Sequence, residues 1–430
     1  MAATRANSSQ EKTLVRIGLL LICSFSLSRF SVQADDWLQW RGPNHNGIAR
    51  SQESPPVKWD LETHVLWKSK VPGRGHSSPT LVKDYIFLST ADESSQVQSI
   101  LCFDRRSGKP LWKKSIHQGK FAKPIHKKNT HASPTIASDG KAIYVVFNRD
   151  SSVFLSKLAL DGQILWQINA GRFEPHYPFG FAASPTVFES SIIVSSESEK
   201  VGFIAAFDLK NGKEKWRTPR LNTTYSSPIV GKIAGKSQLL LSGNQAVTAF
   251  DPRRGTILWS TPALWQASCG TLVWSQDSVF ASGGFPKSQT LCVKADGSGQ
   301  VVWQNNVKCY EQSLLYHDGY LYAISDSGIG YCWNASNGKE MWKTRMEGPV
   351  SSSPILANGN IFYSSERGTT FVFKANPDQF ELVSKNRVGD SAFATPAFCD
   401  DRIYIRVGIY EENRLQEYLV CIGKNQDGQQ

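Results

Sequence analysis

The sequence has few cysteines and places no two of them side by side. Its 430 residues contain 8 cysteines, and Cys23 falls in the N-terminal apolar stretch. The remaining seven are an odd number at wide spacings, which excludes a compact disulfide framework. The sequence also contains no Cys-x-x-Cys-His haem site, no His-Glu-x-x-His and no Gly-x-Ser-x-Gly. The usual sequence motifs for covalent haem attachment, for one class of zinc protease and for one class of serine hydrolase are therefore absent.

Long basic runs and long apolar runs are missing as well. The formal net charge is +11, yet lysine and arginine are scattered, and His126-Lys127-Lys128 belongs to a small cluster only. A nucleic-acid-binding protein concentrates such residues in a stripe. We therefore expect a solvated basic surface and no nucleic-acid partner.

The N-terminus has the pattern of a secretory signal peptide. Three basic residues precede the apolar residues 17–27, and Ala34 ends a stretch with small residues at the cleavage positions. A membrane anchor is the alternative, but the apolar run is shorter than the roughly 20 residues that span a bilayer. We predict that residues 1–34 are removed near Ala34, which leaves no transmembrane segment and a periplasmic or secreted protein.

A repeated unit fills the mature chain. Each copy starts with a Ser-Pro dipeptide or a variant of it, followed by a short apolar strand, a polar turn and a second strand. The copies start at Ser78, Ser133, Ser184, Ser227, Ser268, Ser313, Ser353 and Thr395. Repeats of this length predict an array of stacked units.

The second half of each unit ends in a turn that leads to a tryptophan. Asp accepts backbone hydrogen bonds in such a turn, and Gly adopts the positive φ that other residues resist. The steps between tryptophans are 39 to 54 residues long, which suits four short strands. We expect these indoles to pack between units rather than to bind a ligand. They are Trp67, Trp112, Trp166, Trp216, Trp259, Trp303 and Trp342.

Four-stranded units of this kind cannot bury both of their faces alone, so they must stack, and radial stacking closes the array. The predicted fold is all-β: an eight-bladed β-propeller of four-stranded antiparallel blades over residues 64–423. Residues 35–63 form a lead-in and residues 424–430 a polar tail. The last unit lacks a tryptophan strand, whereas Trp67 precedes the first unit. An N-terminal strand is therefore expected to complete the last blade and close the ring.

Four cysteines occupy a position where other units have a small residue. Ala206 and Ala249 show the usual residue in the third strand, which reads Ala-Phe-Asp. Cysteine there is expected to act as a small buried hydrophobe. The four are Cys102, Cys292, Cys332 and Cys421.

The Ser-Pro start, the Ala-Phe-Asp strand and the Asp-x-x-x-Gly-x-x-x-Trp turn resemble the pyrroloquinoline-quinone (PQQ) repeats of quinoprotein dehydrogenases. They also resemble the propeller lipoprotein of the outer-membrane barrel-assembly machinery. The lead-in from Trp37 to Gly47 is similar to the start of secreted bacterial PQQ-like repeat proteins. The resemblance implies the fold, whereas activity depends on the site.

Quinone enzymes of this fold carry a disulfide between adjacent cysteines, a calcium ion and an aspartate base. This sequence has no Cys-Cys dipeptide and no dense Asp/Asn calcium loop. We therefore predict no catalytic residue, no cofactor and no metal site. PQQ with Ca²⁺ stays as the cofactor of the rival hypothesis below.

Candidate ligand-binding residues stand just before the Ser-Pro starts, where the chain crosses from one blade to the next. These crossings ring the mouth of the central channel in a propeller. Their mixture of aromatic, cationic and hydrogen-bonding groups suits an anionic or planar ligand, although polar loops that cap the blade ends are an alternative. The candidates are Arg74, His76, His131, Tyr225, Trp265, Gln266, Lys308 and Glu311.

The leading functional hypothesis is an exported, monomeric, non-catalytic propeller that binds a protein or peptide in the cell envelope. The rival is a PQQ-type oxidoreductase with a divergent cofactor site in the channel. A carbohydrate-binding propeller is a third hypothesis, which rests on exposed aromatic residues.

Overall fold

The computed structural model describes residues 36–50, 54–122, 125–221, 224–243, 245–264 and 267–424. The predicted signal peptide, the end of the polar tail and two candidate site residues, Trp265 and Gln266, lie outside the described residues. Within the described ranges, no helix is long and apolar enough to span a membrane.

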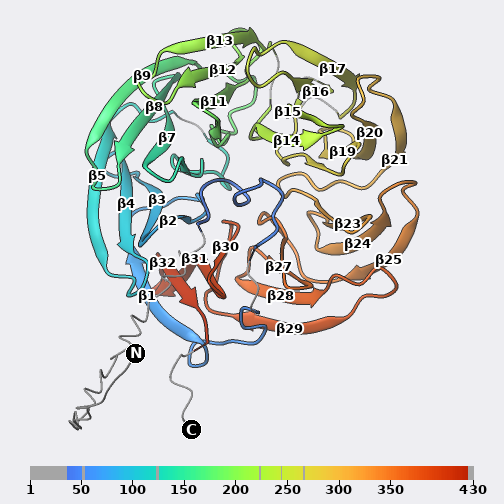
Figure 1. The fold of residues 1–430 in the computed structure, drawn as a ribbon. Helices are drawn as coiled ribbons and strands as arrows, with labels where there is room; N and C mark the ends of the chain where they lie inside the picture. The colour runs from blue at the N-terminus through green and yellow to red at the C-terminus, as the bar shows by residue number, and fades with distance from the viewer. Residues whose placement is uncertain are drawn as a thin grey trace, which may run out of the picture. The chain divides into compact units, whose positions relative to one another are not determined.

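Eight antiparallel four-stranded sheets, counted over the described residues, stand around a central axis (Figure 1). This confirms the predicted eight-bladed all-β propeller. The inner strands are β2 (Thr80–Val82), β6 (Ala137–Ser138), β10 (Thr186–Phe188), β14 (Ile229–Ile233), β18 (Val273–Trp274), β22 (Leu315–His317), β26 (Ile355–Ala357) and β30 (Ala397–Cys399). The second strands are β3 (Tyr85–Asp92), β7 (Ala142–Arg149), β11 (Ser191–Ser196), β15 (Lys236–Gly243), β19 (Ser278–Gly283), β23 (Tyr320–Ile324), β27 (Asn360–Ser364) and β31 (Arg402–Glu411).

The other two strands of each blade lie farther from the axis. The third strands are β4 (Val97–Asp104), β8 (Ser152–Ala159), β12 (Phe203–Asp208), β16 (Ala246–Phe250), β20 (Gln289–Lys294), β24 (Ile329–Asn334), β28 (Thr369–Lys374) and β32 (Arg414–Ile422). The outer strands are β5 (Pro110–Gln118), β9 (Ile164–Arg172), β13 (Glu214–Pro219), β17 (Ile257–Pro262), β21 (Val301–Asn305), β25 (Glu340–Arg345), β29 (Leu382–Arg387) and β1 (Val65–Val71). The second and third strands are largely buried, whereas the outer strands alternate between partly buried and exposed residues.

The first strand of the chain closes the ring. Strand β1 pairs antiparallel with β32, so that Lys68 faces Val420 and Val71 faces Glu417. The eighth sheet has the order β1-β32-β31-β30 and thus joins both ends of the chain. The predicted closure is confirmed, since pairing satisfies the backbone groups of two strands that would otherwise be free edges.

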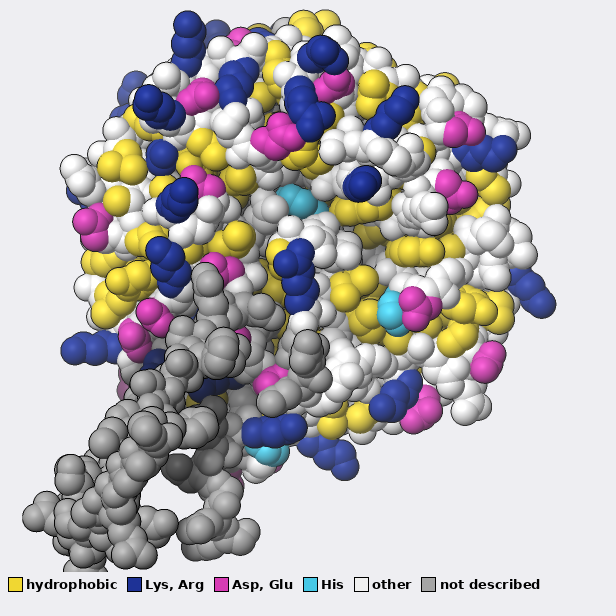
Figure 2. All heavy atoms as spheres, in the orientation of Figure 1, with side chains coloured by type: hydrophobic (Ala, Val, Ile, Leu, Met, Phe, Trp, Pro, Cys, Tyr) yellow, Lys and Arg dark blue, Asp and Glu magenta, His cyan; other side chains and the backbone are white. Residues whose placement is uncertain are grey.

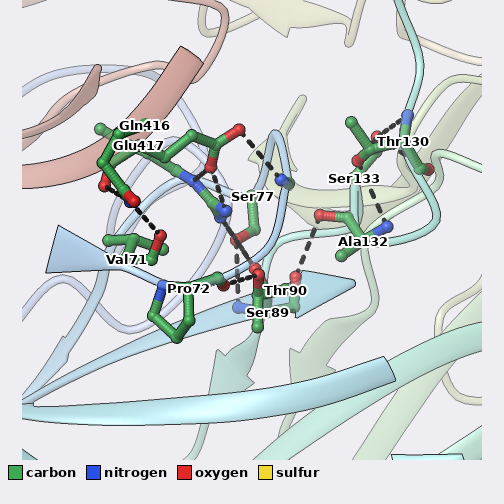
Figure 3. Close-up of polar contacts among 12 residues, drawn as sticks. Val71, Pro72, Ser77, Ser89, Thr90, Thr130, Ala132, Ser133, Gln416 and Glu417 are labelled. Carbon is green, nitrogen blue, oxygen red and sulfur yellow. Dashed lines mark hydrogen bonds and ion pairs between the residues drawn. The ribbon is translucent and has the colours of Figure 1, made fainter. Parts of the chain in front are cut away.

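A buried polar network ties the eighth blade to the first (Figure 3). Arg406 donates from Nε to Glu417 Oε2 at 2.7 Å and from Nη1 to the carbonyl of Ser89 in the first blade at 2.8 Å. Gln416 donates from Nε2 to the carbonyl of Val71 at 2.9 Å, where β1 ends. The side chains of Arg406 and Glu417 are 2% and 8% exposed. The ion pair is therefore shielded from solvent, and each charge depends on the other.

The tryptophans of the outer strands lie against the turn of the following blade. A Cβ atom on Gly255 would stand 2.3 Å from Trp216 Cε3, and Gly255 has a φ of +73°. Trp216 Nε1 donates to the carbonyl of Pro252 in the same turn at 3.2 Å. Four more pairs pack in this way, namely Trp67 with Gly108, Trp112 with Gly162, Trp166 with Gly212, and Trp303 with Gly338. Glycine is required at these turns both by its conformation and by the indole above it.

The small residues of the third strands lie opposite these tryptophans. Ala206 faces Trp216 and Ala249 faces Trp259 in the strand register. The cysteines predicted to be small buried residues face Trp112, Trp303, Trp342 and Trp67, in the order Cys102, Cys292, Cys332 and Cys421. All four are buried free thiols. A small side chain at this position leaves room for the indole on the neighbouring strand.

The lead-in crosses the centre of the ring, as the dark blue segment of Figure 1 shows. It contacts the first, second, fifth, sixth and seventh blades, and the third through Gln39 and Val187, before it enters the eighth as β1. Its hydrogen bonds join Trp37 to Leu81, Leu38 to Ser138, Trp40 to Thr271, Arg41 to Leu314, and Ala49 to Leu356. Most of these partners lie in or beside inner strands, so the lead-in covers one end of the channel. The sequence predicted the segment but not this position.

Basic side chains are spread over the viewed face. Figure 2 shows lysine and arginine around the ring, mixed with acidic side chains, rather than in one stripe. This distribution agrees with the expectation of a solvated basic surface on that face.

Truncation of the blade tryptophans should destabilise the ring. We expect Trp259→Ala, at a side chain that is 5% exposed, to cost about 3–5 kcal/mol of unfolding free energy through lost burial and a cavity. The half-buried Trp216→Ala should change stability in the same direction by a smaller amount. Chemical denaturation measures both, with Leu61→Ala at a 62% exposed side chain as the control. Parent-like melting of both tryptophan variants would refute the inter-blade role.

Deletion of residues 35–68 should open the ring and cause aggregation, because it removes most of β1 and leaves β32 as a free edge. Attachment of the same segment after Ile422 through a flexible linker should restore folding. Deletion of residues 35–59 separates the two contributions, since it removes most of the lead-in, including the buried Trp37 and Trp59, and keeps β1. Size-exclusion chromatography and thermal melting report the result. A monomeric 35–68 deletion protein with unchanged melting would contradict the closure.

Candidate functional site

One hydroxyl group from each blade surrounds the channel, two residues before the first paired residue of the inner strand. Backbone N–H groups donate to the hydroxyl of the next blade at 2.9–3.0 Å in six neighbouring pairs of the described residues. The eight residues are Ser78, Thr135, Ser184, Ser227, Thr271, Ser313, Ser353 and Thr395. We call them the hydroxyl ring. The ring links inner strands through groups that would otherwise be buried without partners.

Two of the eight predicted starts are displaced from this position. In the second blade Thr135, and not Ser133, belongs to the ring, because Thr135 stands two residues before the first paired residue, Ala137, just as Ser78 stands two residues before Thr80. In the fifth blade the position belongs to Thr271 rather than to Ser268. The Ser-Pro dipeptide is thus a marker of the repeat, whereas strand register decides which residue reaches the ring.

The connections from outer to inner strands gather at one end of the channel. In the described residues they comprise 72–79, 119–122, 125–136, 173–185, 220–221, 224–228, 263–264, 267–272, 306–314, 346–354 and 388–396. Because successive strands run in opposite directions, the hairpins between second and third strands lie at the same end. We call this end the crossing face. The lead-in covers the opposite end, where the inner strands finish.

A cavity of about 210 Å³ lies in the mouth of the channel at the crossing face. Trp40 of the lead-in and four members of the hydroxyl ring form part of its lining. Aromatic and charged side chains of the crossings form the rest, among them His76, Phe179, Tyr225, Lys128 and Glu311. The cavity therefore combines an aromatic wall with a charged corner.

The charged corner joins segments from opposite sides of the mouth. Lys128 Nζ lies 2.6 Å from Glu366 Oε1 and 3.6 Å from Glu311 Oε1. Ser351 donates its hydroxyl to Glu366 Oε1 at 2.7 Å and also contacts Glu311. Burial raises the pKa of Glu311, against the opposing effects of Ser351 and Lys128. Burial would lower the pKa of Lys128, but the hydrogen bond and charge of the two carboxylates raise it.

The two candidate histidines are in different surroundings. His76 lines the cavity and stacks on Phe393, with ring centroids 4.6 Å apart and planes 10° apart. Burial lowers the pKa of His76 to about 3, and the positive charges of Arg406 and Arg74 act in the same direction. His131 instead packs on Phe121, with ring centroids 4.2 Å apart, beside a smaller cleft. The two imidazoles therefore line different cavities.

Aromatic rings lead from the surface of the crossing face to the cavity. Phe285, which is 43% exposed, lies edge-on to Tyr177 with centroids 6.0 Å apart. Tyr177 stacks on Phe179 at 5.2 Å, and Phe179 contacts Tyr225 at 5.6 Å. We call these four residues the aromatic track. Tyr225 also donates its hydroxyl to the carbonyl of Tyr177 at 3.2 Å.

The structure brings only some of the sequence-predicted site residues together in the cavity. His76, Tyr225 and Glu311 line the cavity together. Lys308 pairs with Asp326 at 3.6 Å, with its ammonium 5.2 Å from the ring centroid of Tyr310, while Arg74 lies exposed at the rim. Trp265 and Gln266 lie outside the described residues.

Sequence reasoning missed several side chains of the site. Trp40 was missed because it belongs to the lead-in, and Glu366 because it lies in the hairpin between β27 and β28 rather than in a crossing. Phe179 and Ser351 were in crossings, but nothing in the sequence showed that they face the channel. Lys128 belonged to a noted basic cluster whose position was unknown.

The fold and its repeats define the class of the protein, which is an eight-bladed propeller of PQQ-type repeats. The family described as "Outer membrane protein assembly factor BamB" matches residues 50–167, 96–295 and 287–376. The chain belongs to this family. The overlap of the matched ranges is typical of repeats, which align with one another in more than one register.

Individual relatives agree with this assignment. The chain is similar to the outer membrane protein assembly factor BamB of Shewanella oneidensis, with 20% identity over 318 residues, 71% of this chain and 76% of that protein. The crystal structure of BamB from Moraxella catarrhalis has a TM-score of 0.59 and 14% identity, covering 83% of this chain and 99% of that one. Quinohemoprotein alcohol dehydrogenase from Comamonas testosteroni has a TM-score of 0.64 and 13% identity, covering 92% and 82%. These likenesses between structures concern the fold alone.

The lining of the cavity does not fit PQQ. The quinone carries several carboxylates, whereas the charged corner offers two carboxylates against the single ammonium of Lys128. Cys269 lines the cavity, yet no adjacent cysteine exists in the sequence to form the disulfide of the quinone enzymes. No group of three or more His, Cys, Asp or Glu side chains among the described residues could hold a metal ion.

The partly buried imidazole of His76 should make the protein sensitive to acid. Its folded pKa of about 3 lies below the ordinary value near 6.5, so the unfolded chain binds the proton first as the pH falls through this window. Stability should therefore fall below pH 6.5 until the folded pKa is reached. His76→Phe should reduce the loss of unfolding free energy between pH 7.5 and 4.5 by about 1–2 kcal/mol.

Urea denaturation at the two pH values measures this loss. His126→Phe is the matched control, because His126 lines the same cavity but is exposed to solvent. An identical pH dependence in the parent and in His76→Phe would show that the imidazole of His76 contributes nothing to acid sensitivity.

Proposed function

We propose that the protein is a non-catalytic scaffold of the cell envelope that binds a segment of another protein at its crossing face. The family match supports this proposal, since the relatives are described as outer membrane protein assembly factors. The predicted signal peptide agrees with an envelope location and remains a prediction. The proposed ligand-binding residues are those predicted from the sequence, namely Arg74, His76, His131, Tyr225, Trp265, Gln266, Lys308 and Glu311.

The observation that carries the proposal is the set of contacts that the polar groups of the cavity make with one another. Glu311 and Glu366 contact Lys128 and Ser351, and these contacts connect three different crossings and one hairpin. His76 is held against Phe393 with its imidazole neutral at ordinary pH. The polar groups of the cavity thus contact one another and join loops from distant parts of the chain, which suits a surface that binds a partner.

Exposed apolar residues of the crossing face support a protein partner. Phe285 and Leu221 are 43% and 54% exposed, at the edge of an otherwise polar set of loops. Apolar and aromatic residues within a polar rim are typical of protein-binding surfaces. Carbohydrate binding would also use aromatic rings, but no observation favours it over a protein partner.

Site-specific photo-crosslinking tests the proposal. A benzophenone amino acid at Phe285 or Leu221 should capture a specific envelope protein in cells. The same amino acid at Leu111 or Leu165, which are 44% and 47% exposed at the start of outer strands on the opposite side, should capture much less. Equal capture from both sets, or none from either, would refute binding at the crossing face.

The oxidoreductase hypothesis has its own test with the purified protein. PQQ and Ca²⁺ should produce no quinone absorption band and no dye-linked oxidation of alcohols or sugars. Reproducible oxidation that depends on PQQ would contradict the scaffold proposal and favour the quinoprotein alternative.

A further inference from the structure

The charged corner holds more negative than positive charge. Glu311 and Glu366 share one ammonium group, that of Lys128. Of the charged groups nearby, Asp326 pairs with Lys308 and Arg406 with Glu417, while Arg74 lies exposed at the rim. The neutral imidazole of His76 adds no compensating charge. When both carboxylates are ionised, the corner carries one unbalanced negative charge in a partly buried site, where a second cation is favourable.

Solvent and ligands can reach this corner. The side chains of Lys128 and Glu311 are 29% and 28% exposed, so this ion pair is not sealed inside the ring, whereas the side chain of Glu366 is 10% exposed. A volume of about 210 Å³ suits one large side chain rather than a bulky cofactor. Lys128 stands between the carboxylates as an internal cation that an incoming one could replace, because its more exposed pair, with Glu311, contributes little net stability.

The aromatic track connects the cavity to the surface of the crossing face. It runs from exposed Phe285 through Tyr177 and Phe179 to Tyr225, which lines the cavity. Stacked rings accept apolar side chains, and their faces also attract the stem and head group of a basic residue. The track and the charged corner therefore select for an apolar group and a cation that are close together in one ligand.

We propose that the cavity receives an arginine or lysine side chain, next to an apolar residue, from an extended segment of the protein partner. The basic head group replaces Lys128 between Glu311 and Glu366, and the apolar residue lies on the aromatic track. Arginine is favoured over lysine, because its planar guanidinium donates to two carboxylates at once and stacks on aromatic rings. This inference rests on the proposed function and specifies the chemistry of the partner.

Titration of the purified protein with short peptides tests the inference. The probe is N-acetyl-Phe-Arg-amide, and its neutral counterpart is N-acetyl-Phe-citrulline-amide, which keeps the shape but loses the charge. Calorimetry should show at least tenfold weaker binding of the citrulline peptide. Lys128→Met should strengthen binding of the arginine peptide at least tenfold, since it removes the internal competitor.

Variants of the two carboxylates should have the opposite effect on the affinity for the arginine peptide. Glu366→Gln and Glu311→Gln should each weaken binding of the arginine peptide at least tenfold. Glu189→Gln is the control, because it removes the same charge from an exposed pair with Arg253 outside the cavity. Its affinity should equal that of the parent. Circular dichroism of each variant checks that the ring remains folded.

Several results would overturn the inference. They are equal affinity for the two peptides, no gain in Lys128→Met, or no loss in both glutamine variants. Binding of calcium chloride by Lys128→Met without binding of the arginine peptide would make the corner a metal site instead. Crosslinks at Phe285 without peptide binding would reject this inference and keep the proposed function, whereas peptide binding without crosslinks would do the reverse.

Discussion

Contact between neighbouring blades is the interaction on which the ring depends. A four-stranded sheet buries one side on each neighbour, so no blade has a complete core of its own. Two sets of contacts hold the blades together at different distances from the axis. Near the outside, indoles such as that of Trp216 pack on the turn glycine of the next blade. Near the axis, the hydroxyl ring connects the inner strands.

Contacts between blades matter most where the ring closes. The eighth blade combines strands from both ends of the chain, so its cohesion cannot come from short hairpins alone. The buried pair of Arg406 and Glu417 lies at this seam and reaches Ser77 and Ser89 in the first blade. A second buried pair, Arg220 with Glu197, lies within the ring. Buried charges with a single good partner favour one arrangement strongly, because any other leaves a charge unpaired.

The functional surface follows from the same geometry. Radial stacking brings eight crossings to one end of the channel, so residues far apart in sequence meet there. Lys128 and Glu366 are 238 positions apart and nevertheless lie within 2.6 Å of each other. The lead-in covers the other end and supplies Trp40 to the lining. Only the crossing face therefore leaves the cavity accessible to a ligand in the described part of the chain.

The sequence alone determined the architecture, since its periodicity records local events. Strand length, turn residues such as Gly255 and the tryptophan that follows recur in each unit, and each depends on near neighbours in the chain. The missing outer strand of the last unit likewise revealed that Trp67 must complete it. These signals are local or countable, which explains why the blade number and the closure were predicted correctly.

Only the tertiary structure decided which side chains share the channel. Ser133 and Thr135 are equally good candidates by composition, and strand register selects Thr135, which stands two residues before the first paired residue, Ala137. His76 and His131 occupy similar places in the sequence, yet one enters the cavity and the other packs beside it. The sequence of the hairpin between β27 and β28 does not single out Glu366 as a site residue. Strand register and the path of each crossing set these positions, and both depend on packing across the whole ring rather than on neighbouring residues.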